Sequence, residues 1–349
     1  MAIVGGGVAA LRIAAGLGHA GAAPLVLGPD GALGSMHDAR DIGLVTRGLA
    51  EHPHRLAAAI GDEGARDLHR WTQTGAAAAR MLIAPCPVVR ASAGEGEDAD
   101  IAADLDAAAT LGFAAAPLCP DEVAEQLGTK AFGRGWVGRG GVVEPAHALA
   151  ELAREAVEAG AILRGGCAVE TLEGRPSGTR LHTARGAVDA DVVVLAGDWR
   201  MRDIDPWCTD KVGPVRHHLA RYAPPADTHP GPVVMSSQHG WLRSRTDRDG
   251  SLTIAGARWA SPHFDVGETD RTPAPPIADA LHRLVAQRLP RWHAAGRTHS
   301  WTTIAAHTCD QLPIVGPLPG RSAVVACFGW NGRPWSMAIR AADAVVEGL

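Results

Sequence analysis

The sequence has no apolar run that approaches the roughly 20 residues a membrane-spanning helix needs. It also has no run of Lys and Arg, and its formal net charge of −5 gives no cationic surface for nucleic acid or anionic lipid. The first expected strand begins at residue 2, which leaves no room for a leader peptide. We therefore expect a cytoplasmic protein whose partners include neither nucleic acid nor membrane.

Close cysteine pairs and histidine motifs are missing as well. The six cysteines are scattered over 349 residues, so free thiols in a reducing compartment are expected. The 16 histidines form no HExxH-like cluster. The adjacent His217 and His218 would point to opposite sides of a strand, which makes a shared metal unexpected. The sequence thus predicts no metal site, and no P-loop, carboxylate pair or Ser-His-Asp set stands in a convincing context.

What is present is an alternation of strands and helices that predicts an α/β fold of two domains. The continuous apolar segment DADVVVLAGDW is typical of a buried parallel strand. Several short strands are expected between 212 and 259, with a hairpin turn at TDRDGS. Two segments, AGEGEDAD and GRGWVGRGG, are expected to be loops. Helices are expected over 8–19, over 52–82 with breaks near Gly61 and Gly75, and over 101–112, 119–128, 145–160, 277–289 and 336–347.

A glycine turn joins the first strand to the first helix. Gly5 and Gly7 would permit a tight turn and close approach of backbone to phosphate, the arrangement that holds a dinucleotide pyrophosphate. An acidic residue for the ribose is expected at the end of the second strand. That strand ends at Gly28, and Asp30 follows two residues late, so either Asp30 reaches back or backbone and a water replace it. The alternative is strand–helix packing with no ligand.

Several segments, taken in order, resemble the FAD-dependent D-amino-acid oxidase superfamily, especially its glycine oxidase and sarcosine oxidase branch. Each segment is modest alone, but together they span nearly the whole chain. They are AIVGGGVAALRIAAGLGHAG with PLVLGPDGALGS, GGVVEPAHALAELAREAVEAGA, DADVVVLAGDW, VGPVRHHL, WLRSRTDRDGSLTIAG, CDQLPIVGPLP and GWNGRPWSMAIRAADAV.

The resemblance implies a Rossmann-like FAD-binding domain assembled from discontinuous segments, with a β-rich α+β substrate domain. The first would comprise 1–82, 140–208 and 305–349, and the second 83–139 and 209–304. FAD would be non-covalent, because Cys309 aligns poorly with the cysteine that some relatives use for attachment. The residues implied to bind FAD are Gly5, Gly7, Ala9, Ala10, Gly28, Asp30, Ser35, Met36, His37, Val169, Ala196, Gly197, Gly329, Trp330, Asn331, Gly332, Arg333 and Pro334.

The chain departs from the family where substrate would bind. Ala305 stands at the position of a carboxylate-binding Arg, and Ser336 at that of the Lys found in sarcosine oxidases. Arg333 is the first candidate replacement, and the others are Arg40, Arg243, Arg245 and Arg258. Ten Trp accompany a single Tyr, so flat walls for a bulky aromatic or cationic amine are one interpretation, and core packing is the other. The Trp residues in question are Trp241, Trp259, Trp301, Trp330 and Trp335.

The function implied is FAD-dependent oxidation of the C–N bond of an amine or amino acid, by hydride transfer to flavin N5, with O2 or another electron acceptor. Catalytic roles are predicted for His37, Arg333 and His307, where a histidine would deprotonate a substrate ammonium; His307 is equally interpretable as structural. Substrate contacts are predicted for Trp241, Arg243, Arg258 and Trp335. Two alternatives remain, a 2-hydroxy-acid dehydrogenase of the same fold and a catalytically silent flavoprotein subunit.

Overall fold

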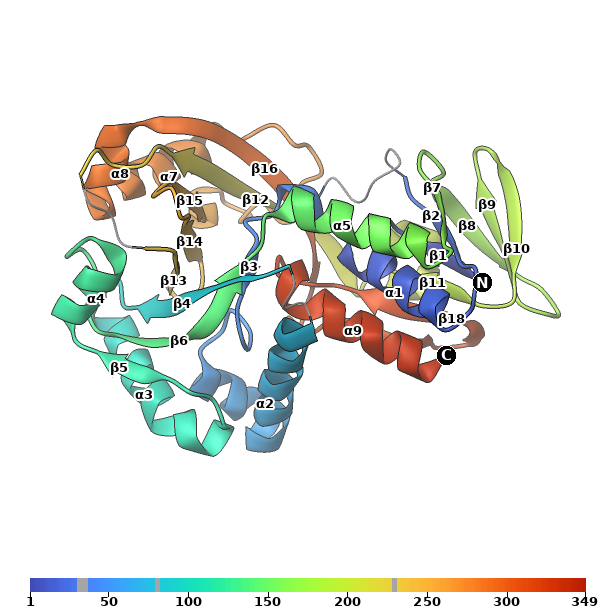
Figure 1. Cartoon of the computed structure of the whole chain (residues 1–349), viewed down its shortest axis with the longest axis horizontal. Helices are drawn as coiled ribbons and strands as arrows, with labels where there is room; N and C mark the ends of the chain where they lie inside the picture. The colour runs from blue at the N-terminus through green and yellow to red at the C-terminus, as the bar shows by residue number, and fades with distance from the viewer. Residues whose placement is uncertain (30–36, 79–81, 228–230) are drawn as a thin grey trace.

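The computed structural model describes residues 1–29, 37–78, 82–227 and 231–349. Two large sheets organise these residues, and Figure 1 shows them on opposite sides of the molecule. The first has six strands in the order β17-β18-β11-β1-β2-β7, parallel except for the antiparallel pair β17–β18. Its strands are β17 (Ile314–Leu318), β18 (Arg321–Phe328), β11 (Val193–Leu195), β1 (Ala2–Val4), β2 (Leu25–Leu27) and β7 (Ile162–Arg164).

Three helices pack beside one another against this sheet. Helix α1 (Val8–His19) lies between α5 (Pro145–Glu158) and α9 (Pro334–Gly348) (Figure 1). Two glycines of α1 allow this close packing. A Cβ at Gly16 would lie 2.9 Å from Val346 Cγ2, and one at Gly18 would lie 2.4 Å from the carbonyl oxygen of Ala159. The Ala- and Gly-rich composition of α1 therefore reflects burial on two sides.

The second large sheet has nine strands and carries most of the β-rich section. Its order is β16-β12-β15-β14-β13-β4-β6-β3, with β5 paired to β6. The strands are β16 (Arg297–Thr308), β12 (Val212–Tyr222), β15 (Leu252–Ala255), β14 (Leu242–Thr246), β13 (Val233–Ser237), β4 (Ala84–Ala91), β6 (Gly135–Val142), β3 (Leu44–Val45) and β5 (Ala116–Leu118). Apolar residues of α4 (Pro120–Leu127), α7 (Pro275–Arg288) and α8 (Pro290–Ala295) share one core cluster with its strands.

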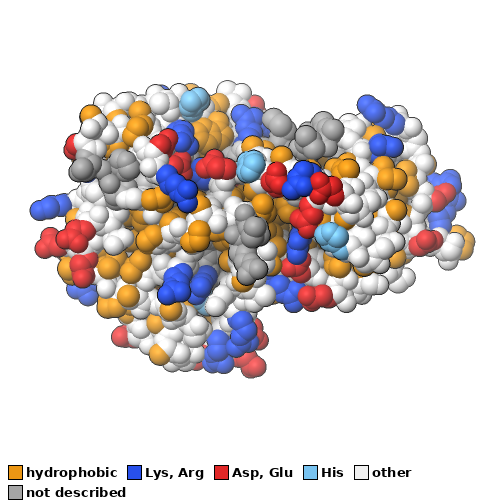
Figure 2. Space-filling view, viewed as in Figure 1, with side chains coloured by type: hydrophobic (Ala, Val, Ile, Leu, Met, Phe, Trp, Pro, Cys, Tyr) orange, Lys and Arg blue, Asp and Glu red, His pale blue; other side chains and the backbone are white. Residues whose placement is uncertain are grey.

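The remaining elements lie at the ends of the molecule. Helices α2 (Pro53–Ala78) and α3 (Glu95–Leu111) pack together below the second sheet in Figure 1. A small antiparallel sheet, formed by β8 (Val169–Gly174), β9 (Thr179–Thr183) and β10 (Gly186–Ala190), lies at the far end beyond β7. On the face shown in Figure 2, basic and acidic side chains lie beside one another, with hydrophobic side chains scattered between them.

Most of the expected elements, and the α/β class, are confirmed, but two expected loops are wrong. The segment GRGWVGRGG forms strand β6, where the strands approach so closely that a Cβ at Gly140 would lie 2.4 Å from the carbonyl oxygen of Val45. The segment AGEGEDAD is mostly helical, because α3 begins at Glu95. Helix α2 breaks at Gly61, as expected, where φ is +80°, but it continues through Gly75, where the second expected break is wrong.

Three further expectations concern the chain as a whole. The six cysteines form no disulfide. Within the described ranges, no helix combines the length and apolar character that crossing a membrane requires. The domain boundaries stay a prediction; strand β3, placed in the first domain from sequence, pairs with β6 in the nine-stranded sheet.

Candidate active site

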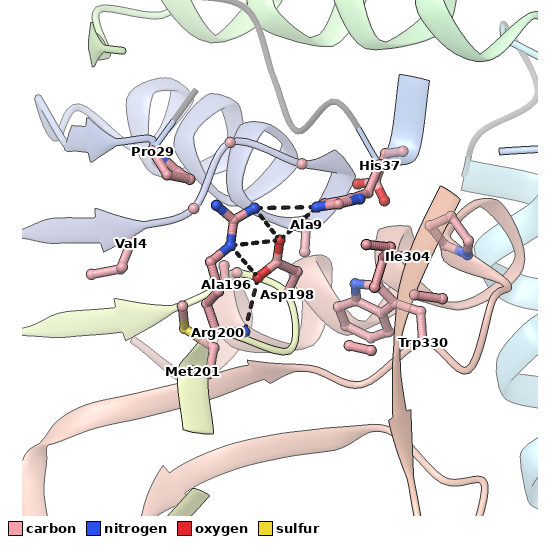
Figure 3. Close-up of a pocket in the computed structure, with 18 of the residues that line it drawn as sticks. Val4, Ala9, Pro29, His37, Ala196, Asp198, Arg200, Met201, Ile304 and Trp330 are labelled. Atoms are coloured by element: carbon pink, nitrogen blue, oxygen red, sulfur yellow. Dashed lines mark hydrogen bonds and ion pairs between the residues drawn. The ribbon is translucent and has the colours of Figure 1, made fainter. Parts of the chain in front are cut away.

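A cavity lies at the carboxyl ends of β1, β2 and β11, where the glycine turn meets the loop after β11 (Figure 3). We call it the glycine-turn cavity. It encloses about 1000 Å³, part of it open to solvent. Ligands of open α/β sheets bind at such an edge, outside the carboxyl ends of the strands. Of the residues expected to bind a dinucleotide, those on its wall are Gly5, Gly7, Ala9, His37, Val169, Ala196, Gly197, Trp330, Gly332 and Pro334.

The glycine turn has no space for a side chain. Gly5 has φ +134°, and a Cβ there would lie 2.3 Å from the carbonyl oxygen of Ala196. Helix α1 then begins after Gly7 with no acidic residue in its first turn, and the Val8 N–H donates to Asp38. A helix N-terminus of this kind carries partial positive charge and attracts phosphate. The guanidinium of Arg200 lies on the same wall, where it pairs with the carboxylate of Asp198.

A network of charged side chains crosses this wall (Figure 3). Arg200 Nη2 donates to Asp198 Oδ2 at 2.7 Å, and His37 Nε2 lies 3.2 Å from the same oxygen. Burial alone would raise the pKa of Asp198, but the hydrogen bonds from His37 and Arg200 outweigh it and lower that pKa well below its usual value. Thr303 Oγ1 donates to the carbonyl oxygen of His37 at 3.0 Å. These bonds fix His37 on the wall of the cavity.

Asp38 lies at the N-terminus of α1, and its pKa provides a test of the electrostatics there. It accepts a 2.8 Å hydrogen bond from Val8 N–H, yet burial raises its pKa to about 6. The folded state therefore holds this proton more tightly than the unfolded chain, so the stabilisation is complete below about pH 4 and is lost as pH rises through 6. A shift of this size corresponds to about 3 kcal/mol, and we expect about half because the side chain is partly exposed.

Asp38→Asn should remove this dependence while keeping an acceptor for Val8. Denaturant unfolding of the FAD-bound protein at pH 4 and pH 7 measures it. The variant should gain about 1.5 kcal/mol relative to the unsubstituted protein between these two pH values. An unchanged difference across this range would show that Asp38 titrates normally.

A second cavity, of about 940 Å³ including its open part, meets the first at His217, which lines both. We call it the arginine cavity, because Arg243 and Arg258 lie on its wall. Trp241, His307 and Asn331, which the sequence predicts to lie near substrate or flavin, also line it. Lining residues that the sequence analysis missed include Glu51, His218, His239, Gly240 and Gln311.

A chain of hydrogen bonds at the junction fixes the protonation of two histidines. Arg243 Nη2 lies 3.2 Å from His217 Nδ1 and can only donate, so the proton of His217 is on Nε2. His217 Nε2 lies 2.9 Å from His307 Nε2, which must accept. Burial and then the nearby Arg258 lower the pKa of His217 well below normal and that of His307 to about 3. Both rings are therefore neutral, and Nδ1 of His307 carries its proton.

Arg258 carries unused hydrogen-bonding capacity into the arginine cavity. Its guanidinium carbon lies 5.0 Å from the centre of the Trp241 ring, a cation–π contact, and that tryptophan is 40% exposed. Its Nη1 is buried and finds no hydrogen-bond partner in the part of the chain that the structure describes. Burial and the neighbouring Arg243 lower its pKa to about 10, so Arg258 remains a cation at neutral pH. A buried, unpaired guanidinium nitrogen is the kind of group that binds a carboxylate.

Some predicted residues lie away from both cavities. Arg333 is buried and donates to the carbonyl oxygen of Gly48 at 2.9 Å, and burial lowers its pKa. Trp335 belongs to the core beneath α1 and α9. Ser336 Oγ accepts from Thr46 N–H at 3.0 Å and so joins α9 to the segment after β3. Ala10, Gly28 and Gly329 also lie off the two lining surfaces, and Asp30, Ser35 and Met36 lie outside the described residues.

The other candidate replacements are engaged in structural contacts. Arg245 donates to the carbonyl oxygen of Val143 at 2.5 Å and to Glu144 Oε1 at 2.8 Å. Arg40 is on the lining of neither cavity, and its contact with Trp301 is made by the backbone, whose carbonyl oxygen accepts from Nε1 at 2.9 Å. His218 bonds Asp265 at 2.8 Å, so it and His217 take different partners.

The family model described as FAD dependent oxidoreductase (DAO) matches residues 1–347. Glycine oxidase from Geobacillus kaustophilus has a similar solved structure, with 20% identity, a TM-score of 0.81 and coverage of 99% of this chain and 94% of that one. L-proline dehydrogenase from P. horikoshii is 15% identical, with a TM-score of 0.81 and coverage of 99% and 91%. Iminodiacetate oxidase from Chelativorans sp. BNC1 is 16% identical, with a TM-score of 0.74 and coverage of 99% and 95%. No curated protein sequence matches the chain.

Proposed function

Because the chain belongs to the family of FAD-dependent oxidoreductases, we propose that it oxidises the C–N bond of an amino acid with a bulky or aromatic part. FAD would bind non-covalently in the glycine-turn cavity, and substrate would bind in the arginine cavity. One observation carries the substrate class: the buried Nη1 of Arg258, beside the junction of the two cavities, has no hydrogen-bond partner among the residues that the structure describes. The names of the similar solved structures, oxidases or dehydrogenases of glycine, L-proline and iminodiacetate, support the same class.

The walls of the glycine-turn cavity fit FAD on several counts. The cradle at Gly5 has no space for a Cβ, the N-terminus of α1 offers partial positive charge for a pyrophosphate, and Val169 lines the end expected for adenine. Neither cavity has a cysteine among its described lining residues, which supports non-covalent binding. When bound, FAD would supply the chemistry by accepting a hydride at N5 from the carbon next to nitrogen.

The residues of the chain bind and orient the substrate and set its protonation. Arg258 would hold the carboxylate, since Arg243 already donates to the carbonyl oxygen of Gly332 at 2.9 Å and to His217. The face of Trp241 would form a flat wall against an apolar side chain. Positive charge on both arginines disfavours a bound ammonium and lowers its pKa, so the reactive neutral amine forms without a dedicated base. His217 and His307 add no charge because both stay neutral.

His307→Asn tests whether this histidine is a base, as one sequence interpretation predicts. With a pKa of about 3, a neutral His307 is a poor acceptor for an ammonium proton. We expect the rate of anaerobic flavin bleaching to fall by less than about tenfold, with its pH dependence unchanged. A loss of about 100-fold or more, with loss of one limb of the pH profile, would restore the role of His307 as general base.

The substrate class is tested by mixing the yellow protein anaerobically with three panels: amino acids, the matching decarboxylated amines and 2-hydroxy acids. Bleaching by bulky amino acids, and far less by their amines, supports the proposal. Bleaching by hydroxy acids alone would favour the 2-hydroxy-acid dehydrogenase, and no bleaching by any panel would favour a silent flavoprotein subunit.

Because Ser336 stands at the position of the Lys found in sarcosine oxidases, we expect O2 to reoxidise the reduced flavin slowly and another electron acceptor to be used. Fast aerobic recovery of the yellow colour would contradict this.

A further inference from the structure

A compact cluster of histidines and carboxylates lies beside the arginine cavity, where α2 and α3 meet the turn between β13 and β14. His52 just precedes α2, Asp100 and Asp104 are on α3, and His239 is in the turn. One nitrogen of His52, one nitrogen of His239 and one oxygen of Asp100 lie within 4.8 Å of one another. His239 also lines the arginine cavity, so the cluster borders an opening to solvent.

His52 is oriented by a carboxylate behind it. Its Nδ1 lies 2.7 Å from Asp104 Oδ2, and His54 Nδ1 lies 2.8 Å from Asp104 Oδ1. The carboxylate of Asp104 therefore accepts from both rings. His52 therefore donates from Nδ1 and turns Nε2 toward Asp100 and His239. Metal-binding histidines are held in this way by a carboxylate on their second nitrogen.

The nitrogen that His52 presents has no hydrogen bond. His52 is 0% exposed, and its Nε2 lacks a partner among the described residues; the same holds for Nδ1 of His239. His52 Nε2 lies 3.8 Å from Asp100 Oδ2 and 3.9 Å from Glu97 Oε1, too far for a hydrogen bond. A buried lone pair aimed at two carboxylates is unfavourable unless a proton or a metal ion lies between them.

The separations suit a metal ion. His239 Nδ1 lies 3.2 Å from Asp100 Oδ2, and His52 Nε2 lies 3.8 Å from it. Two ligands bound to one zinc at about 2.0–2.1 Å lie about 3.3 Å apart in tetrahedral geometry, a value these separations bracket. Asp100 Oδ2 also accepts from Arg55 Nη2 at 2.6 Å, and a carboxylate oxygen with two lone pairs can accept both.

The turn that carries His239 is held in a strained conformation. Gln238 and His239 both have left-handed backbone angles, with φ of 54° and 53°, although such turns favour Asn-Gly. Both of their N–H groups donate to the carboxylate of Glu97, at 2.9 and 2.8 Å. These two hydrogen bonds offset the backbone strain and orient the side chain of His239 toward Asp100.

We propose that His52, Asp100 and His239 bind a divalent transition-metal ion such as zinc, with Asp104 positioning His52 and the Glu97 carboxylate beside the ion. Two imidazoles and one carboxylate form a donor set that suits zinc. The ion would join α2 and α3 to the turn that leads into Gly240 and Trp241. It would thereby fix one wall of the arginine cavity.

The test uses the full FAD-bound chain, treated with a chelator, exchanged into metal-free buffer and titrated with Zn²⁺. We expect one zinc per chain to remain through gel filtration, by atomic emission, and the midpoint of thermal unfolding to rise with zinc. His239→Asn keeps a residue that tolerates the left-handed backbone and should bind zinc at least tenfold more weakly. Asp104→Asn should weaken binding about 10–100-fold by releasing the orientation of His52.

His182→Ala is the matched control, since His182 is an exposed histidine 3.0 Å from a carboxylate oxygen of Glu173 on the small sheet. It should retain zinc like the unsubstituted protein. The proposal is overturned if the chain retains no zinc, or if His239→Asn binds zinc as tightly as the control. Flavin absorbance, which each variant should keep, verifies folding independently of the metal.

Discussion

Gly5→Ala is expected to give a protein that purifies without FAD. The new methyl carbon would lie 2.3 Å from the carbonyl oxygen of Ala196, so β1 and the loop after β11 must move apart where the cofactor should bind. The backbone at Gly5, with φ +134°, is also unfavourable for alanine. Overpacking and backbone strain together should cost about 3 kcal/mol or more of stability. The ratio of flavin to protein absorbance and the thermal unfolding midpoint measure the two effects.

Two glycine variants serve as controls. Gly16→Ala places a Cβ 2.9 Å from Val346 Cγ2 in the packing of α1 against α9, so it should lower stability yet retain FAD. Gly174→Ala on β8 places a Cβ with no atom within 4 Å and should change neither property. If Gly5→Ala retained FAD as Gly16→Ala does, the glycine turn would not be the pyrophosphate cradle.

The sequence predicted a helix or strand correctly where the residues of that element show the helical or strand periodicity themselves. Helix α5 shows this, since Pro145 begins it and Leu149 and Leu152 lie on its buried face, as the sequence predicts. The ordered segments also indicated the D-amino-acid oxidase superfamily, and the match to the FAD-dependent oxidoreductase family over residues 1–347 confirms it. This chain therefore belongs to the FAD-dependent oxidoreductases. Its alternation of strands and helices is predictable from sequence periodicity without any tertiary contact.

The wrong expectations share a physical cause, because in each the tertiary environment overrides local composition. Gly135, Gly140 and Gly141 would suit a loop, but they lie in β6, which pairs with β4, and neighbouring atoms leave no space for a Cβ at any of the three. Glu97 is acidic and would suit a solvated loop, yet it is buried because its carboxylate binds the N–H groups of Gln238 and His239. Such long-range demands leave no signal in a single sequence.

The candidate site likewise has parts that the sequence predicts and parts that it does not. The turn at Gly5 and Gly7 was predictable because all its parts are adjacent in sequence. The contacts of His217 were not, since they join β12, β14 and β16 through side chains that carry no local pattern. Arg333 was the preferred anchor from its place in the C-terminal turn, but its side chain donates to the carbonyl oxygen of Gly48. Within the described ranges, Arg258 is the arginine of the arginine cavity that has a buried nitrogen with no partner.

Arg258→Met is expected to lower the rate constant for flavin bleaching by an amino acid about 100-fold at low substrate concentration. Methionine preserves much of the side-chain volume beside Trp241 but cannot bind a carboxylate. Losing a hydrogen-bonded charge partner in a buried site costs about 2–3 kcal/mol, which is the basis of the expected factor. The loss should be mainly in apparent affinity, because the carboxylate is held alike before and during the reaction. Stopped-flow bleaching over a range of substrate concentrations separates affinity from rate.

The same measurement with the decarboxylated amine tests whether Arg258 acts by binding the substrate carboxylate. Because it has no carboxylate, the amine should bleach the flavin of Arg258→Met and that of the unsubstituted protein at similar rates, whereas bleaching by the amino acid should show the full loss. Arg291→Ala, which removes an arginine that pairs with Asp227 away from both cavities, should change neither rate. Equal losses for amine and amino acid would mean that Arg258 shapes the cavity instead of binding the carboxylate. The carboxylate anchor would then have to be sought at Arg243, whose two hydrogen bonds within the protein would first have to rearrange.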